Sequence, residues 1–550
     1  MLRAATPFRG FAGNVVLRYL PAGSGRGLDE PCAKRASPCR HGCARRRRDV
    51  RRAIGRAAIS LLLLFVALAA AYQLDHPRRA TAGDATALTV TQTWARQVAG
   101  AGYDDLPPPV VEKLVLTLAD CAGVWVYASG LEHVERFREL TDSAGRGEAT
   151  EWVSGRRVSL AEAAAINAFA LHAHEIDDSN LRNQLRASCA AVPAPLAVAE
   201  AVDASGRELL VALAISYQVS DALATAMNRQ PAGRLHQRGW MPTSMCGPLG
   251  GAAAAGRLLE LNADQLTSAM GLSAGGAGGL FQYYHDGSDE KRVHVARAQR
   301  VAVESARLAR AGFLGAPGAV DGAAGLLAAL GFAPSETQLP RALAPWDAVL
   351  HVKPKFYACS QGVIPWLEVL EPLLDQSPLE ADAVREVLLS VDAPPESHYV
   401  AKINHFQPPL TLLDAQLSVN FGLALRICRG AAFVDEYTAE NLAAADILAL
   451  ARRVRAIRDS EKPGQLRVEL ADGRVLRGRY EPANFEAVYE PVVDDYRRKF
   501  DRLAGEHLSP AQCEALWQHV VRLPEAASVA RWSAELAGHM QRPRGRSVQK

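Results

Sequence analysis

The chain has 550 residues, of which 49% are hydrophobic and 22% charged, and its formal net charge is +3. This length exceeds what one hydrophobic core accommodates, so we expect two or more domains. The composition is typical of folded globular proteins, and it excludes an intrinsically disordered chain, a collagen-like fibre and a polytopic membrane protein.

The charge is unevenly distributed along the chain. Residues 1–56 carry 14 Lys and Arg against 3 Asp and Glu, whereas residues 57–550 carry 48 basic and 56 acidic residues. A protein that binds nucleic acid through its folded body needs a basic surface to neutralise phosphates. The acidic body therefore predicts no nucleic-acid partner, and residues 1–56 are predicted to be a basic, disordered extension.

An uncharged, apolar segment of 18 residues follows this extension, at residues 57–74. It just reaches the length of a transmembrane span, and its basic flank would keep the N-terminus cytoplasmic. The small residues Ala69 to Ala71 also fit the end of a signal peptide. A third alternative is a misassigned start, in which case the start codon is not Met, because no Met occurs between Met1 and Met227. The body is thus predicted to be cytoplasmic, either membrane-anchored through 57–74 or soluble.

The nine cysteines do not form a metal-binding pattern. Cys32, Cys39 and Cys43 lack the paired spacing of zinc knuckles, and the other six are widely spread. Structural zinc and iron–sulfur sites require clustered thiolates. We predict a reducing compartment and no metal.

Apolar residues recur at helical spacing through most of the body. A proline run at 107–109 marks a helix start, and the turn at 203–206 separates two helices. We predict one large helical domain at 86–345, with helices at 94–99, 110–128, 160–173, 192–202, 207–227, 252–261, 263–273 and 293–311.

The pattern changes near residue 352. A strand is predicted at 384–391 and a hairpin at 465–470 and 475–480, around Asp472 and Gly473. Helices are predicted at 411–428 and 439–455 between them, which gives a smaller α+β domain at 352–482. Residues 490–540 are predicted to be helices that pack back on the large domain. The fold class is therefore mainly α with a smaller α+β domain.

Three segments carry residues suited to chemistry. Residues 172–180 follow an apolar helix with two histidines and three carboxylates, which could transfer protons or bind metal. The alternative is a solvated helix end capped by Asp178 or Ser179. Residues 271–294 join packing glycines to Lys291, Arg292 and His294, a cluster that suits a carboxylate substrate, or else a solvated cationic cap. Residues 353–362, with Lys355, lie at the predicted domain boundary, a favoured place for small-molecule sites rather than a plain linker.

These segments, together with residues 118–124, resemble the MmgE/PrpD family of 2-methylcitrate dehydratases, which includes cis-aconitate decarboxylase. The resemblance runs from about residue 86 to 536. It implies a helical domain with an α+β lid, a homodimer, and a cleft between the domains that binds small di- or tricarboxylates without a metal or cofactor. Family members eliminate water, decarboxylate or epimerise next to a carboxylate, which requires proton-transfer groups and cations.

The family's site residues are carried over unevenly. Lys291, Lys355 and His294 match the family's two lysines and a histidine, and Glu175 and Ser179 replace an Asp and a Thr. Arg186 and Met241 stand where the resemblance expects histidines, and Phe421 stands where it expects a tyrosine. Neither Met nor a permanently charged Arg replaces an imidazole in proton transfer.

We therefore expect a lyase or isomerase of the 2-methylcitrate dehydratase type, a hydro-lyase, acting on a small di- or tricarboxylate. The alternative is a catalytically inactive, membrane-tethered carboxylate-binding or scaffold relative. The residues predicted for catalysis are Lys291, His294, Glu175, His174 and Ser179, and those predicted for substrate binding are Arg186, Lys355, Asp178 and Arg292.

Overall fold

The computed structural model describes residues 87–140, 147–228, 235–333, 337, 339–480 and 491–540. The predicted basic extension, the apolar segment 57–74 and Cys32, Cys39 and Cys43 lie outside the described residues. From Leu88 onward the chain forms one compact unit. The six cysteines described in this unit are free thiols.

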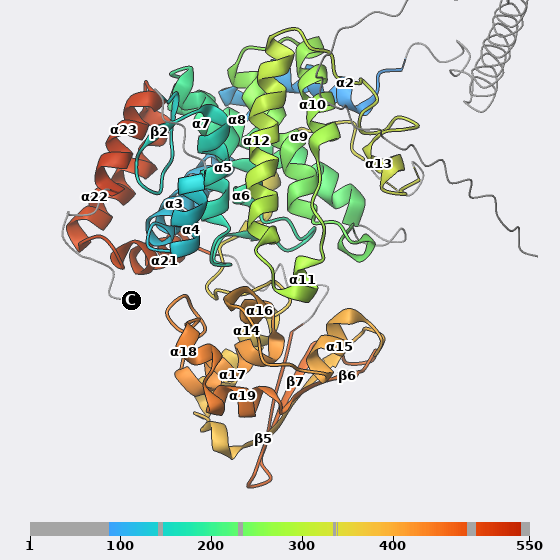
Figure 1. The fold of residues 1–550 in the computed structure, drawn as a ribbon, viewed down its shortest axis with the longest axis vertical. Helices are drawn as coiled ribbons and strands as arrows, with labels where there is room; N and C mark the ends of the chain where they lie inside the picture. Colours follow the sequence, from blue (N-terminus) through green and yellow to red (C-terminus); the bar gives the residue numbers. More distant parts are fainter. Residues whose placement is uncertain are drawn as a thin grey trace, which may run out of the picture. The chain divides into compact units, whose positions relative to one another are not determined.

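The first part of the unit is a bundle of helices built around α9 (Figure 1). Helix α9 packs against α8, α10 and α12, and α5 packs against α12 and α7. The helices of this part are α2 (Val90–Gly100), α3 (Pro108–Ala128), α4 (Glu132–Leu140), α5 (Leu160–Leu171), α6 (Ala187–Ala191), α7 (Pro193–Ala201), α8 (Gly206–Asn228), α9 (Pro242–Leu258), α10 (Ala263–Gly276), α11 (Tyr283–Asp286), α12 (Glu290–Arg310) and α13 (Leu326–Ala329).

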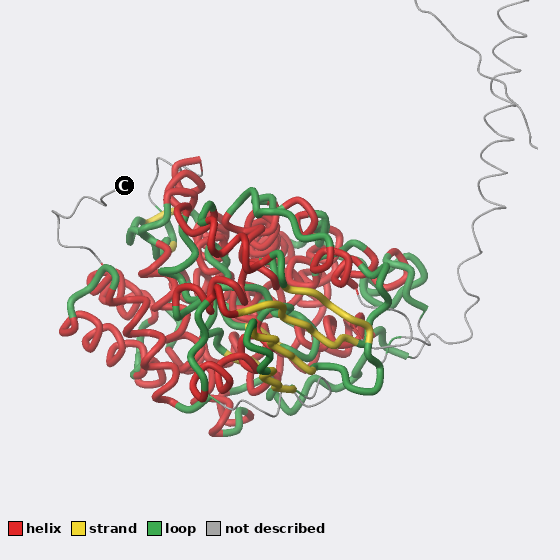
Figure 2. The backbone as a smooth tube through the Cα atoms, turned by 90° about the horizontal axis from the view of Figure 1, so that it is seen from below, coloured by secondary structure: helices red, strands yellow, loops and turns green. Residues whose placement is uncertain are grey.

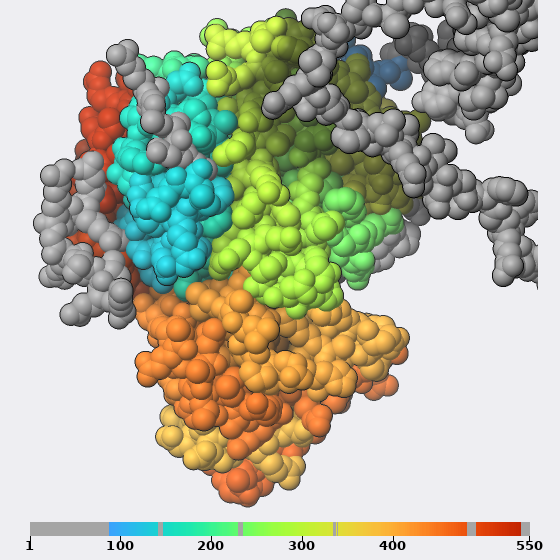
Figure 3. All heavy atoms as spheres, in the orientation of Figure 1, coloured from blue at the N-terminus to red at the C-terminus, as the bar shows by residue number. Residues whose placement is uncertain are grey.

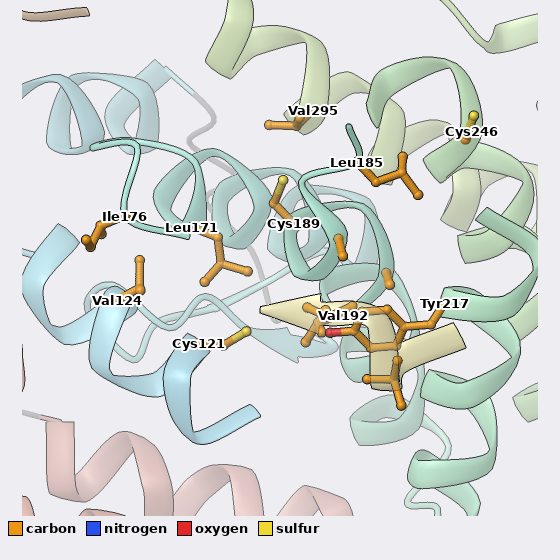
Figure 4. Close-up of a cluster of buried hydrophobic side chains, with 14 of the residues drawn as sticks. Cys121, Val124, Leu171, Ile176, Leu185, Cys189, Val192, Tyr217, Cys246 and Val295 are labelled. Atoms are coloured by element: carbon orange, nitrogen blue, oxygen red, sulfur yellow. The ribbon is translucent and has the colours of Figure 1, made fainter. Parts of the chain in front are cut away.

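Small residues allow these helices to approach closely. A Cβ atom added to Gly250 of α9 would lie 2.5 Å from the Ser216 carbonyl oxygen of α8, so no larger residue fits there without moving the helices apart. The predicted helix at 252–261 in fact begins at Pro242, because the Gly- and Ala-rich stretch before it is also packed as helix. Figure 4 shows part of the resulting core, including Cys189 of α6 and Ile176 of the loop after α5.

Helix α8 is long and apolar enough to cross a membrane, but 83% of its most apolar window is buried inside the protein. A helix that is apolar on all sides is expected at the centre of a large helical core. We therefore interpret α8 as a core helix, and it is unrelated to the apolar segment predicted at 57–74.

The second part is an α+β lid whose sheet has the strand order β6-β5-β7-β8 (Figure 2). Strand β5 pairs in parallel with β6 and antiparallel with β7, and β7 and β8 form the predicted hairpin. The elements are β4 (Val352–Lys353), α14 (Ile364–Gln376), β5 (Val384–Val391), α15 (His398–Asn404), α16 (Leu412–Gln416), α17 (Val419–Arg429), α18 (Ala439–Leu442), α19 (Ala445–Ala451), β6 (Val454–Arg458), β7 (Gln465–Leu470) and β8 (Val475–Arg479).

The structure corrects two helices predicted for the lid. The predicted helix at 411–428 is divided, because Ser418 caps a new helix by accepting a hydrogen bond from the Phe421 amide. The predicted helix at 439–455 ends at Ala451, and its last residues start strand β6 beside β5. In both segments the apolar pattern continues without a break. The helix is interrupted by a new cap in the first segment and by strand pairing in the second.

The C-terminal helices pack on the helical part. They are α21 (Val493–Gly505), α22 (Pro510–Val521) and α23 (Val529–Met540). Helix α21 packs against α3, where a Cβ added to Gly123 would lie 3.2 Å from the ring of Phe500. In Figure 3 these last helices, in red, lie beside the early helices, in blue and cyan. The predicted fold class, mainly α with a smaller α+β lid, is confirmed.

Candidate active site

The loop after α5, residues 172–178, carries a group of buried ionisable side chains. Helix α5 ends at Leu171, and His172, Glu175, Asp177 and Asp178 are all at least 98% buried. Glu175 has a positive backbone φ of 56°, which is uncommon for a residue with a side chain and costs about 1–3 kcal/mol. Surrounding contacts must therefore hold the loop in this shape.

Two buried lysines meet the Glu175 carboxylate. Lys291, in the first turn of α12, forms an ion pair with Oε1 of Glu175. The ammonium of Lys355, just after β4, lies 3.6 Å from Oε2 of Glu175 and 3.4 Å from Oδ1 of Asp177. Residues separated by more than 100 positions in the sequence thus form one charge cluster.

A histidine–aspartate pair lies beside this cluster. Nδ1 of His172 is 2.7 Å from Oδ2 of Asp177, and Nε2 of His172 is 3.9 Å from Oε1 of Glu175. Neither His172 nor Asp177 is among the site residues predicted from the sequence. Their five-residue spacing, which spans a turn rather than one face of a helix, gives no regular signal.

The pKa values in the cluster follow from burial and from these partners. Burial favours the neutral form of Glu175, but Lys291 and Lys355 outweigh it and hold the pKa of Glu175 well below its usual range. Burial lowers the pKa of Lys291 to about 8, although Glu175 opposes that shift. Burial also lowers the pKa of His172, despite Asp177. The cluster therefore holds ionised carboxylates beside a lysine that can give up its proton near neutral pH.

Asp178 lies in a different environment. Its Oδ1 accepts a hydrogen bond of 2.8 Å from the Ser188 amide, its Oδ2 accepts one from the Ser188 hydroxyl, and that hydroxyl lies 2.5 Å from the hydroxyl of Tyr217. Burial raises the pKa of Asp178 to about 7. Asp178 was predicted to bind substrate, and the structure places it inside the helical core.

A cavity of about 730 Å³ lies between the helical part and the lid, and Lys291 and Arg186 both line it. The volume is within the range of small-molecule sites. The helical part also contributes Met241, Thr243 and Tyr283 to the lining, and the lid contributes Ser360, Gln361 and Tyr399. His285 and His398 lie at the lining with their ring centroids 3.7 Å apart.

The structure places the other predicted residues around this cavity rather than in its lining. Lys355 and Glu175 lie behind Lys291. His174 is buried with its ring 5.4 Å from that of Tyr127, and burial lowers its pKa to about 3. Ser179 is buried and pairs through its backbone with Lys353. Arg292 is buried and pairs with Asp289, and His294 packs against Gly279.

The three substituted positions also differ in place. Arg186 and Met241 line the cavity, so the exchange of imidazoles for a guanidinium and a thioether changes the surface that a ligand would meet. Phe421 is fully buried, with its ring centroid 6.1 Å from that of Tyr437 in the lid.

His172, Asp177 and Cys189 bring three ligand atoms within 4.8 Å of one another. The group does not suit a metal ion. Burial raises the pKa of the Cys189 thiol, which keeps it protonated, and the Lys355 ammonium already faces Asp177.

Comparison with known proteins agrees with this architecture. The MmgE/PrpD N-terminal domain matches residues 92–337 and the MmgE/PrpD C-terminal domain matches residues 357–523. The cis-aconitate decarboxylase-like protein oryM of Aspergillus oryzae is 25% identical over 469 residues, 79% of this chain and 95% of that protein. Cis-aconitate decarboxylase of Aspergillus terreus is 23% identical over 469 residues, 80% and 93%. The human cis-aconitate decarboxylase is 26% identical over 246 residues, 43% and 49%. The chain therefore belongs to the MmgE/PrpD family.

Proposed function

We propose that the protein is a lyase that removes CO₂ from a small, unsaturated tricarboxylate. One observation carries the proposal, namely that Lys291 lines the cavity as an ammonium of lowered pKa beside an ionised, immobilised Glu175. The relatives named as cis-aconitate decarboxylases support the substrate class and the reaction. Loss of CO₂ thus takes the place of the water elimination expected from sequence.

In this proposal the cavity binds the substrate through cations. Arg186 offers a planar guanidinium that can hold one carboxylate by two hydrogen bonds, and Lys291 contacts a second. Lys355 stays behind Glu175 and keeps that carboxylate ionised, so its role is to position and balance charge.

The proton balance favours decarboxylation over water elimination. Water elimination needs a base that removes a C–H proton, and Glu175 is a weak base because two lysines stabilise its charge. Loss of CO₂ needs a proton donor. The C–C bond to one carboxylate breaks and CO₂ leaves, and the electron pair spreads through the double bond onto a second carboxylate held by Arg186. One end of this allylic unit then takes one proton from Lys291. The lysine then regains a proton from solvent.

The test is turnover in D₂O followed by NMR, with the full chain and with cis-aconitate and 2-methylcitrate as separate substrates. Decarboxylation predicts CO₂ release from the unsaturated acid and one deuterium at one end of the allylic unit that forms when CO₂ leaves. Because Glu175 raises the pKa of Lys291, Glu175→Gln should move the alkaline limb of kcat to lower pH. Water loss from the hydroxy acid without CO₂ release would show a dehydratase instead.

A second candidate is a carboxylate-binding relative without turnover. It is favoured by Arg186 and Met241, which occupy the lining where the family resemblance expects imidazoles. Binding of either tricarboxylate by calorimetry, without any deuterium exchange in D₂O, would establish it.

A further inference from the structure

Four successive carbonyl oxygens of the active-site loop each accept a hydrogen bond from a different, distant side chain. His133 Nε2 donates to Ala173 over 3.2 Å, and Gln416 Nε2 donates to His174 over 2.9 Å. Lys355 Nζ donates to Glu175 over 2.9 Å, and Lys499 Nζ donates to Ile176 over 2.8 Å. We name these four residues the carbonyl clamp.

The four donors come from four separate elements. His133 belongs to α4 and Lys499 to α21, both on the helical side, whereas Gln416 ends α16 and Lys355 follows β4, both in the lid. A loop stabilised by its own turn chemistry would bond within itself. Here the loop depends on both parts of the fold.

Of the four clamp residues, Lys499 and Gln416 are separated from the loop by the largest number of positions in the sequence. Lys499 is 2% exposed, and its ammonium also pairs with Asp120 Oδ1 at 2.6 Å. Gln416 is fully buried. Burying a lysine or a glutamine costs free energy unless its N–H groups donate hydrogen bonds. Both residues donate to carbonyl oxygens of the loop.

We propose that Lys499 and Gln416 are positioning residues that hold Glu175 in its left-handed conformation, so that its carboxylate faces Lys291. This rests on the proposed function, in which Glu175 is the carboxylate that pairs with the proton donor Lys291. Lid placement and loop shape are thereby coupled, since Gln416 and Lys355 belong to the lid.

The competing explanation is that Lys499 serves only to neutralise the buried Asp120. The double variant Asp120→Leu/Lys499→Met removes both charges of the ion pair together, so neither partner is left buried without the other. Asp120→Asn alone removes the ion pair and leaves Lys499 in place to donate to Ile176. Gln416→Met removes the bond to His174 without changing any charge.

A matched control is Gln299→Met. Gln299 is also fully buried, and its amide donates to the Ala190 carbonyl of α6, outside the loop. It controls for the general cost of losing a buried glutamine hydrogen bond.

The first measurement is hydrogen–deuterium exchange of peptides covering residues 172–178 in the full chain. Exchange should rise at least about threefold in the double variant and in Gln416→Met, and stay near the parent value in Asp120→Asn and Gln299→Met. This readout needs no turnover, so it tests the clamp even if the parent shows no lyase activity.

The second measurement is the pH profile of kcat. Loosening Glu175 removes a charge that raises the pKa of Lys291, so the alkaline limb should move to lower pH in the double variant and in Gln416→Met, with kcat about tenfold lower and KM within about twofold. Parent-like exchange and pH profile in both of these variants would overturn the proposal.

Discussion

Glu175 and Asp178 lie three residues apart in one loop, and both are about 99% buried, yet their pKa values move in opposite directions. Glu175 faces Lys291 and Lys355 and is held ionised. Asp178 accepts a hydrogen bond from the Ser188 hydroxyl, which also contacts the Tyr217 hydroxyl, and its pKa is about 7.

Burial raises the free energy of the charged form of both carboxyl groups, and the neighbouring groups determine whether that cost is offset. Glu175 pairs with Lys291, which lines the cavity, whereas Asp178 lies in the helical core. One short loop therefore holds both an ionised carboxylate and a carboxyl group of raised pKa.

The largest expected effect comes from removing a cation on the Glu175 side. Lys291→Ala should lower kcat/KM by about 10²–10³-fold, since it removes both the proton donor and a carboxylate contact. Steady-state kinetics on the tricarboxylate would measure it. Arg297→Ala, an exposed position on the same helix, is the control, and equal behaviour of the two variants would remove Lys291 from the site.

Lys291→Arg separates the charge from the dissociable proton. The guanidinium keeps the charge opposite Glu175 but does not release a proton near neutral pH, so kcat should fall about 10²-fold while KM changes by no more than a few fold. In the parent, kcat should decline above about pH 8 as Lys291 deprotonates. Survival of that decline in Lys291→Arg would assign it to another group.

Arg186→Met tests a cation that lines the cavity without pairing with Glu175. Loss of the two hydrogen bonds from the guanidinium to a substrate carboxylate should raise KM about tenfold and change kcat less. Arg182→Met, at an exposed position four residues earlier, provides the comparison. A drop confined to kcat would show that Arg186 acts on the transition state rather than on binding.

Asp178→Asn tests the carboxyl group of raised pKa, and its effect is the smallest. The folded-state pKa of about 7 lies above the ordinary 3.8, so the folded protein holds a proton that the unfolded chain releases between about pH 4 and 7. The free energy of unfolding therefore falls as pH rises from about 4 to about 7, by at most about 1.4 kcal/mol per pH unit, and this contribution is fully lost above pH 7.

The amide variant should therefore show a flatter pH dependence of the free energy of unfolding in that window. Denaturant titrations at pH 5, 6, 7 and 8 would measure the difference from the parent. Identical slopes would mean that Asp178 is ionised inside the core.

Local patterns predicted the elements whose signals are local. The strand at 384–391 and the hairpin around Asp472 and Gly473 were found because alternation and turn residues coincide there. Strand β6 was missed because its first residues continue an apolar helical pattern, and only pairing with β5 makes them a strand.

The same distinction between local and long-range signals applies to the candidate site. Lys291, Lys355 and Glu175 could be selected from the family resemblance, and the structure brings them together. His172 and Asp177 lay in a selected segment but had no spacing that marked them as a pair. Gln416 and Lys499 could not be selected, because the partner of each is a backbone oxygen more than 200 residues away.

The carbonyl clamp also sets the order in which the protein can become functional during synthesis. The loop at 172–178 leaves the ribosome early, but its last donor, Lys499, lies 323 residues after Ile176. Because domains made first tend to fold first, the helical core can collapse around an unfinished loop that matures when α21 docks. A chain that stops before α21 would then keep most of its helices while its active-site loop remains unassembled.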